Sequence, residues 1–154
     1  MRNFLFWQKS AEDGFYEVGA VSGAPFQEMH VGRGAAFVDY ANDGAMDVFI
    51  VNQEGAPQLL RNDGGNRKNW LEVAVKCTKS NRSGFGTKVI VDTGGITQRR
   101  EIGGQASYLS QDFRRAHFGL DNQKDVARLT VKFPSGIVRT MEHVAANKIV
   151  TVTE

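Results

Sequence analysis

The residues best placed to do chemistry are three aspartates that recur at every fourth position around one glycine. Asp39, Asp43 and Asp47 have this spacing, and Gly44 directly follows the second of them. A hard cation such as Ca²⁺ takes about six to eight oxygen ligands. A short loop supplies them when alternate side chains point inward and the chain turns sharply, which glycine permits at low cost. The spacing therefore predicts a Ca²⁺ site formed by the three aspartates and the carbonyl oxygen of Ala45.

The third position of such a loop usually carries another oxygen ligand, and here it is Ala41. The predicted site therefore lacks one side-chain ligand, and we expect weakened affinity. The alternative interpretation is a solvated hairpin turn that uses Asp and Gly for geometry alone. Both interpretations predict a strand on each side of the turn, because residues 37–38 and 48–51 are apolar.

This stretch resembles the FG-GAP repeat, also called VCBS, which is the blade unit of integrin-type β-propellers. The resembling residues are 34–40, 42–44 and 46–50. In that family the acidic loop binds Ca²⁺ between two strands of a blade, so the resemblance implies the same role for this loop. Residues 4–18 are similar to the strand and turn that begin such a unit, and Asp13-Gly14 is the sequence signal of a tight hairpin.

About four short strands are predicted within residues 4–62, which is the strand content of one propeller blade. One blade cannot close a propeller, and its flanks would be exposed sheet edges. We therefore expect residues 1–66 to be a blade fragment, with further propeller blades absent from this chain. Packing of the blade on the second half of the chain is the alternative.

Residues 67–154 show strong alternation of apolar and polar side chains, which predicts a second unit. Within residues 126–133, for example, Leu129 and Val131 share one strand face while Arg128 and Lys132 share the other. Eight short strands are predicted, at residues 70–77, 87–92, 96–102, 106–110, 116–120, 126–133, 137–141 and 148–153. The predicted fold is all-β: one propeller-blade-like β-meander followed by an antiparallel β-sandwich.

The second half resembles the ASPIC/UnbV domain, known from bacterial secreted proteins and from cartilage acidic protein. The resemblance covers residues 69–154 and rests on segments in the family's order, at residues 69–71, 80–86, 110–111, 117–120 and 133–136. Family members carry this domain directly after FG-GAP repeats, as the order here implies. Cys77 and Asp121 stand where the family favours glycine, and Phe133 replaces a usual tryptophan. The resemblance implies a secreted, periplasmic or cell-surface protein, although residues 1–7 do not form a signal peptide.

No residue set has the pattern of an active site. His30, His117 and His143 are not paired at metal-ligand spacing, and Ser135 lacks the flanking glycines of a nucleophile elbow. Cys77 is the last residue of the strand predicted at residues 70–77 and lies on its apolar face, so we expect a buried, unreactive thiol. The ASPIC/UnbV resemblance carries no catalytic residues either. We therefore expect no enzymatic activity, with a polysaccharide lyase or hydrolase as the enzymatic alternative.

The two halves of the chain carry net charges of opposite sign. Residues 1–66 hold 4 Lys/Arg and 9 Asp/Glu, a net charge of −5, whereas residues 67–154 hold 15 and 8, a net charge of +7. Either the two halves attract each other or the basic half meets an external polyanion. Because the resemblance places the chain outside the cell, we expect an acidic glycan or an extracellular protein as partner rather than nucleic acid.

The expected function is a non-enzymatic extracellular binding or adhesion module with Ca²⁺ as a structural ion. The alternative is a carbohydrate-binding accessory domain of a polysaccharide-active enzyme. An exposed row of aromatic side chains would favour that alternative. No run of about 18 apolar residues occurs, so we expect no membrane-spanning segment.

Overall fold

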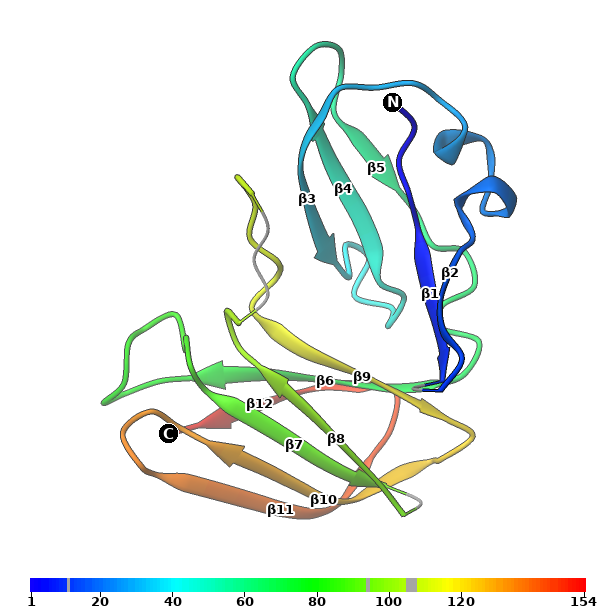
Figure 1. Cartoon of the computed structure of the whole chain (residues 1–154). Helices are drawn as coiled ribbons and strands as arrows, with labels where there is room; N and C mark the ends of the chain where they lie inside the picture. Colours follow the sequence, from blue (N-terminus) through cyan, green and yellow to red (C-terminus); the bar gives the residue numbers. More distant parts are fainter. Residues whose placement is uncertain (11, 94, 105–107) are drawn as a thin grey trace.

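Short β-strands build two units that lie one above the other (Figure 1). The computed structural model describes residues 1–10, 12–93, 95–104 and 108–154. The strands are β1 (Phe6–Ser10), β2 (Gly14–Glu17), β3 (Gly32–Val38), β4 (Asp47–Asn52), β5 (Gln58–Leu60), β6 (Asn69–Lys76), β7 (Lys88–Thr93), β8 (Ile96–Glu101), β9 (Arg115–Asp121), β10 (Asp125–Lys132), β11 (Val138–Ala145) and β12 (Lys148–Thr153). Two 3-10 turns, Gly19–Val21 and Ala24–Phe26, lie between β2 and β3. The all-β prediction is confirmed.

Residues 1–66, which we call the N-terminal unit, contain two small sheets. β1 and β2 form a hairpin, and β3, β4 and β5 form an antiparallel meander in chain order. The tight turn of the hairpin uses Gly14 with a φ of 73°, as its Asp-Gly sequence predicts. The described part of this unit therefore has five strands in two sheets, where about four strands were expected.

Residues 67–154, which we call the sandwich, form two facing sheets in the described part of the chain. Their strand orders are β11-β10-β7-β8 and β12-β6-β9. Every neighbouring pair is antiparallel except β6 and β12, which run parallel with Val73 beside Val150. The chain reaches β12 from the opposite sheet, so no hairpin turn forces it to run against β6.

Seven of the eight strands predicted for the sandwich are found among the described residues. The eighth predicted strand, at residues 106–110, is not found among the described residues. Residues 106 and 107 lie outside the described residues, and Tyr108 and Leu109 form a turn instead of a strand.

The hydrophobic core lies between the two sheets of the sandwich. Its buried residues are Leu71, Val73, Val89, Val91, Ile102, Ala116, Phe118, Leu120, Val126, Leu129, Val131, Phe133, Val144 and Val152. The alternation predicted for β10 is confirmed, because Leu129 and Val131 are 0% exposed. Among the described residues of the N-terminal unit, only Ala45 and Ile50 are buried hydrophobic residues. Apolar burial therefore stabilises mainly the sandwich.

The side chain of Glu154 fastens the end of β12 to the loop that follows β6. Its carboxylate accepts hydrogen bonds from the backbone N–H groups of Thr78, Lys79 and Ser80 at 2.7, 2.6 and 2.8 Å. Burial alone would raise the pKa of Glu154, but hydrogen bonds from Ser135 and Ser80 outweigh burial and hold that pKa well below its usual range. These bonds fix the start of a loop that carries several basic side chains.

Candidate functional site

The predicted Ca²⁺ loop joins β3 to β4, as the sequence indicated. Asp39 is 2% exposed, and its carboxylate accepts hydrogen bonds from the N–H groups of Asp43 at 3.0 Å and Gly44 at 2.8 Å. The carboxylate of Asp43 accepts a bond from the N–H of Ala45 at 3.0 Å. These bonds hold the turn closed from within.

The third aspartate ties the loop to the next strand. Asp47 is 3% exposed and accepts bonds from the N–H groups of Tyr40 at 3.2 Å and Asn62 at 2.8 Å. Among the residues that the structure describes, no three Asp, Glu, His or Cys side chains gather in a group that would hold a metal ion. Each carboxylate oxygen has two lone pairs, so the aspartates that bond to the backbone still suit an oxygen-seeking cation. The Ca²⁺ ligand set stays a prediction.

The acidic loop rests on the sandwich through Gly44. This residue has a φ of +89°, and a Cβ atom added to it would lie 2.0 Å from the indole ring of Trp70. Nε2 of His117 lies 3.0 Å from the Gly44 carbonyl oxygen, which can only accept, so this nitrogen donates. Trp70 and His117 belong to the neighbouring strands β6 and β9. The acidic loop therefore packs against the outer face of these two strands.

A buried ion pair lies on the same outer face. Glu72 is 1% exposed, and its carboxylate accepts a hydrogen bond from Nη1 of Arg115 at 2.7 Å. Burial raises the pKa of Glu72, the bond from Arg115 partly offsets that rise, and the negative charge of Asp39 adds to it. The guanidinium of Arg115 also lies 4.3 Å from the centre of the Phe113 ring. The surface under the loop thus contains a buried charge, on Glu72, that needs Arg115 as its partner.

A second contact joins the units along β3. The N–H of Phe113 donates to the Phe37 carbonyl oxygen at 3.1 Å, and the N–H of Phe37 donates to the Asp112 carboxylate at 2.9 Å. A Cβ atom added to Gly34 would lie 2.9 Å from the carbonyl oxygen of Leu109. The segment that leads into β9 therefore runs beside β3.

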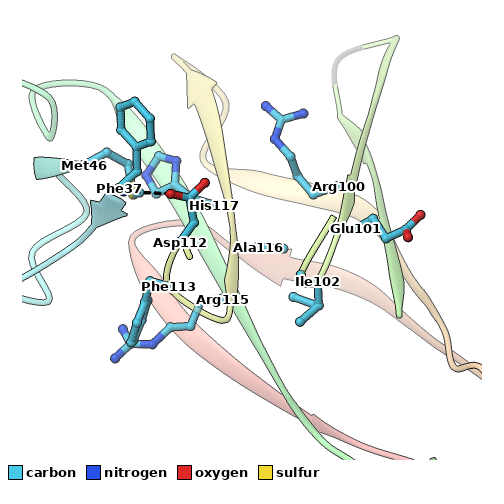
Figure 2. Close-up of a pocket in the computed structure, with 11 residues that line it drawn as sticks. Phe37, Met46, Arg100, Glu101, Ile102, Asp112, Phe113, Arg115, Ala116 and His117 are labelled. Atoms are coloured by element: carbon cyan, nitrogen blue, oxygen red, sulfur yellow. Dashed lines mark hydrogen bonds between the residues drawn. The ribbon is translucent and has the colours of Figure 1, made fainter. Parts of the chain in front are cut away.

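Between these two contacts lies a cleft of about 220 Å³ (Figure 2). Its described lining residues are Phe37, Met46, Arg100, Glu101, Ile102, Gly103, Asp112, Phe113, Arg115, Ala116 and His117. Figure 2 shows Arg100 and Glu101 extending to opposite sides of β8. The guanidinium of Arg100 lies over the Phe118 ring, 5.5 Å from its centre. Both units, with two separate segments of the sandwich, thus form the cleft.

The other residues considered in the sequence lie apart from this cleft or have structural roles. His30 bonds to Glu28 at 2.9 Å, and His143 lies 3.6 Å from Asp125. Cys77 is partly buried against the core, and burial raises the pKa of its thiol, which keeps the thiol protonated at neutral pH.

Sequence reasoning found the acidic loop but missed the surface beneath it. Trp70 and Glu72 lie on the strand face opposite Leu71 and Val73, yet all four residues are buried. A strand buried on both faces needs cover on each side. A bulky Trp and a carboxylate at alternate positions of an otherwise apolar strand were the available signal that a second layer covers β6.

The comparison with protein families gives a match to the model described as ASPIC and UnbV, over residues 77–154. The search of curated proteins finds no match. Among the described residues, no helix has the length and apolar character needed to cross a membrane. β6 precedes the matched range but pairs with both β9 and β12, so it completes the same sandwich. Since the match covers half of the chain, the chain belongs to the ASPIC/UnbV family.

Proposed function

We propose that the chain is a non-enzymatic extracellular binding or adhesion module whose sandwich binds an acidic glycan. The observation that carries this proposal is the gathering of basic side chains from separate segments at one end of the sandwich. These residues, which we call the basic end, are Lys79, Arg82, Lys88, Arg99, Arg100, Arg114 and Arg115.

Three contacts hold the segments of the basic end together. Arg114 donates to the hydroxyl of Ser83 at 2.9 Å, which ties the loop after β6 to the start of β9. The N–H of Gly86 donates to the Ile102 carbonyl oxygen at 3.0 Å. A Cβ atom added to Gly103 would lie 2.2 Å from the Phe85 ring, so the end of β8 packs on the same loop. Positive charge from distant sequence positions is therefore concentrated there.

The N-terminal unit does not neutralise this charge. Every ion pair among the described residues joins partners within one unit, and none crosses from residues 1–66 to residues 67–154. The contacts described between the units are hydrogen bonds and packing around Gly44 and Phe37. The net charge of +7 on the sandwich thus favours an external polyanion over attraction between the halves.

Nucleic acid fits this surface less well than an acidic glycan. Single-stranded nucleic acid needs accessible aromatic rings on which bases stack beside the positive charge. Trp70, the largest aromatic residue of the sandwich, is buried under the acidic loop, which leaves the partly exposed Phe85 and Phe113 as smaller platforms for stacking. The family resemblance also implies a place outside the cell, where an acidic glycan rather than DNA is the expected ligand.

We propose that the N-terminal unit of the module binds a second partner, which is another polypeptide segment. Phe49 pairs with Leu59 across β4 and β5, and both side chains are exposed together with Val51. Such an exposed apolar face is typical of a surface that another sheet covers. We propose a further FG-GAP-like blade as that cover, because β3, β4 and β5 form a meander around an acidic loop.

Calcium is proposed as the structural ion of that loop, held by Asp39, Asp43, Asp47 and the Ala45 carbonyl oxygen. A ligand that binds only the folded state raises stability by about 2.7 kcal/mol at a hundredfold excess over Kd. We expect millimolar Ca²⁺ to raise the melting temperature, and Ala41→Asp to strengthen the effect by supplying the missing ligand. Calorimetry with Ca²⁺ and with chelator measures both, and an unchanged melting temperature in Ca²⁺ would rule the site out.

The proposed glycan binding is tested by retention on heparin and on DNA of equal charge density across a salt series. We expect selective retention on heparin that weakens as salt rises, because exposed charges are screened beyond roughly 8 Å at physiological salt. Equal retention of both polymers would mean unspecific charge attraction. Retention of neither at physiological salt would refute the proposal, and salt-resistant retention on DNA alone would refute the extracellular assignment.

The alternative function, a carbohydrate-binding accessory domain, has one specific observation in its favour. Trp7 and Tyr16 pair across the β1–β2 hairpin with ring centres 6.4 Å apart, and both residues are about half exposed. Exposed aromatic pairs suit the apolar faces of sugar rings. Retention on neutral polysaccharide that Trp7→Ala abolishes would favour this alternative over the acidic-glycan module.

A further inference from the structure

We infer that the cleft between the two units is the subsite for one uronate residue of the glycan, with Arg100 binding its carboxylate. This inference rests on the proposed binding of an acidic glycan and adds the place and the chemical group. It assigns to the N-terminal unit a direct part in forming the site, through Phe37 and Met46.

Arg100 is the cation of the cleft that no described carboxylate neutralises. Its side chain is half-buried, lies over Phe118 and donates from Nη1 to the Arg99 carbonyl oxygen at 2.9 Å. No described Asp or Glu forms an ion pair with it. A guanidinium has five N–H donors arranged in a planar fork that matches a carboxylate. Apart from the bond to the Arg99 carbonyl, the guanidinium therefore has no acceptor among the described residues.

The remaining charged groups of the cleft already have partners. Arg115 is paired with Glu72, and one oxygen of Asp112 accepts the N–H of Phe37. Glu101 lies 3.9 Å from Arg99, on the other side of β8 from Arg100. Asp112 keeps its negative charge, because its partner is a neutral N–H group. Arg100 is thus the cation of the cleft that can bind an anionic group of a ligand.

The walls of the cleft suit a sugar that carries this anion. Phe37 is 45% exposed, so part of its side chain is available to the apolar face of a sugar ring. Phe113 is 40% exposed, with the Arg115 guanidinium over one face of its ring. Among the described residues, the one hydrogen bond to Asp112 uses Oδ1, which leaves the second oxygen to accept a sugar hydroxyl. Apolar walls with few placed polar groups are typical of small-molecule sites.

The size of the cleft limits the ligand to one residue. Its volume of about 220 Å³ is below the range of about 300–1,000 Å³ for sites that enclose drug-sized molecules. A second hollow, lined by Arg99, Arg100, Glu101 and Gly104, adjoins the cleft, because Arg100 and Glu101 line both. A polymer with one uronate in the cleft would therefore continue over the basic end.

The test is calorimetric titration of the full chain with tetragalacturonate, using the wild type, Arg100→Gln and Arg139→Gln. Arg139 is the matched control, because it carries the same charge and lies on β11, at the opposite edge of the sheet from β8. We expect Arg100→Gln to weaken binding by about tenfold or more, as for a lost charged hydrogen bond. Arg139→Gln should change the affinity by less than about threefold.

Equal losses in the two variants would overturn the cleft assignment. If heparin retention were then unchanged, the proposed function would stand without this subsite. Methyl-esterified tetragalacturonate should not bind, and tetraglutamate should bind at least about tenfold more weakly than tetragalacturonate. Equal binding of tetraglutamate would overturn the sugar assignment.

Amide chemical shifts of the wild type give a readout that does not depend on the variants folding. Tetragalacturonate should shift Ala116, His117 and Phe37, which line the cleft, and leave Thr140 on the distant strand β11 unchanged. Shifts confined to residues outside the cleft lining would contradict the proposal.

Discussion

Arg115→Ala is expected to lower the free energy of unfolding by about 3–5 kcal/mol, which is the usual cost of removing one partner of a buried ion pair. Glu72 is 1% exposed and has Arg115 as its partner at 2.7 Å. Without the guanidinium, the carboxylate must stay charged in a dry site beside Asp39 or take up a proton. Urea unfolding at pH 7 measures the change. Arg114→Ala, at an exposed neighbour bonded to Ser83, should change stability by less than about 0.5 kcal/mol.

The dependence on pH distinguishes this mechanism from lost packing against Phe113. Burial raises the pKa of Glu72 in the folded chain, so the folded state binds its proton more tightly than the unfolded state does. In Arg115→Ala, protonation of Glu72 stabilises the folded chain. This stabilisation is complete below the pKa that Glu72 has in the unfolded chain, and it is lost as pH rises through the pKa that Glu72 has in the folded chain. The defect should therefore shrink at pH 4–5 (about the unfolded pKa of Glu), and Glu72→Gln added to Arg115→Ala should recover part of the loss at pH 7. A defect that is equal at both pH values would contradict the assignment.

Gly44→Ala is expected to cost about 2–5 kcal/mol, from the strain of a positive φ together with overpacking against Trp70. The added Cβ would lie 2.0 Å from the indole ring, and the hydrogen bond from His117 to the Gly44 carbonyl would be disturbed by any shift of the loop. We expect the acidic loop to lose its contact with Trp70 and His117 while the core of the sandwich stays folded. Limited proteolysis should then cut the N-terminal unit faster than the sandwich.

Gly136→Ala is the matched control for that substitution. Gly136 has the same φ of +89° as Gly44, but an added Cβ would meet no atom within 4 Å. It should therefore cost only the backbone strain, about 1 kcal/mol, and leave the proteolysis pattern unchanged. Equal effects of the two substitutions would show that the contact with Trp70 does not hold the units together.

The strands of the sandwich could be predicted because their apolar and polar residues alternate over one core. β10 and β12 were placed within one or two residues by this pattern, and the Asp-Gly turn placed the first hairpin. Pairing between distant strands leaves no such local pattern, so the parallel direction of β12 beside β6 was not predicted. The segment that contacts β3 was expected to contain a strand, because apolar residues at 108–109 resemble one in composition.

The candidate site was predictable only where it is continuous in sequence. The acidic loop is such a case, because Asp39, Asp43, Gly44 and Asp47 are close along the chain. The cleft joins Phe37, Arg100 and Phe113, which come from three separate elements, and the sequence gives no measure of their distance. Arg99 and Arg100 look equivalent in the sequence, and only the strand parity of β8 in its sheet distinguishes them.

The sandwich contains the folded core of the chain and holds the N-terminal unit in the position that forms the cleft. The proton NMR spectra of residues 1–66 and of residues 67–154, each expressed alone, test this arrangement most directly. We predict well-dispersed amide signals for residues 67–154, which contain every residue of the hydrophobic core identified in the described chain. Residues 1–66, with Ala45 and Ile50 as their described buried hydrophobic residues, should give a poorly dispersed spectrum. A well-dispersed spectrum from residues 1–66 alone would contradict the account.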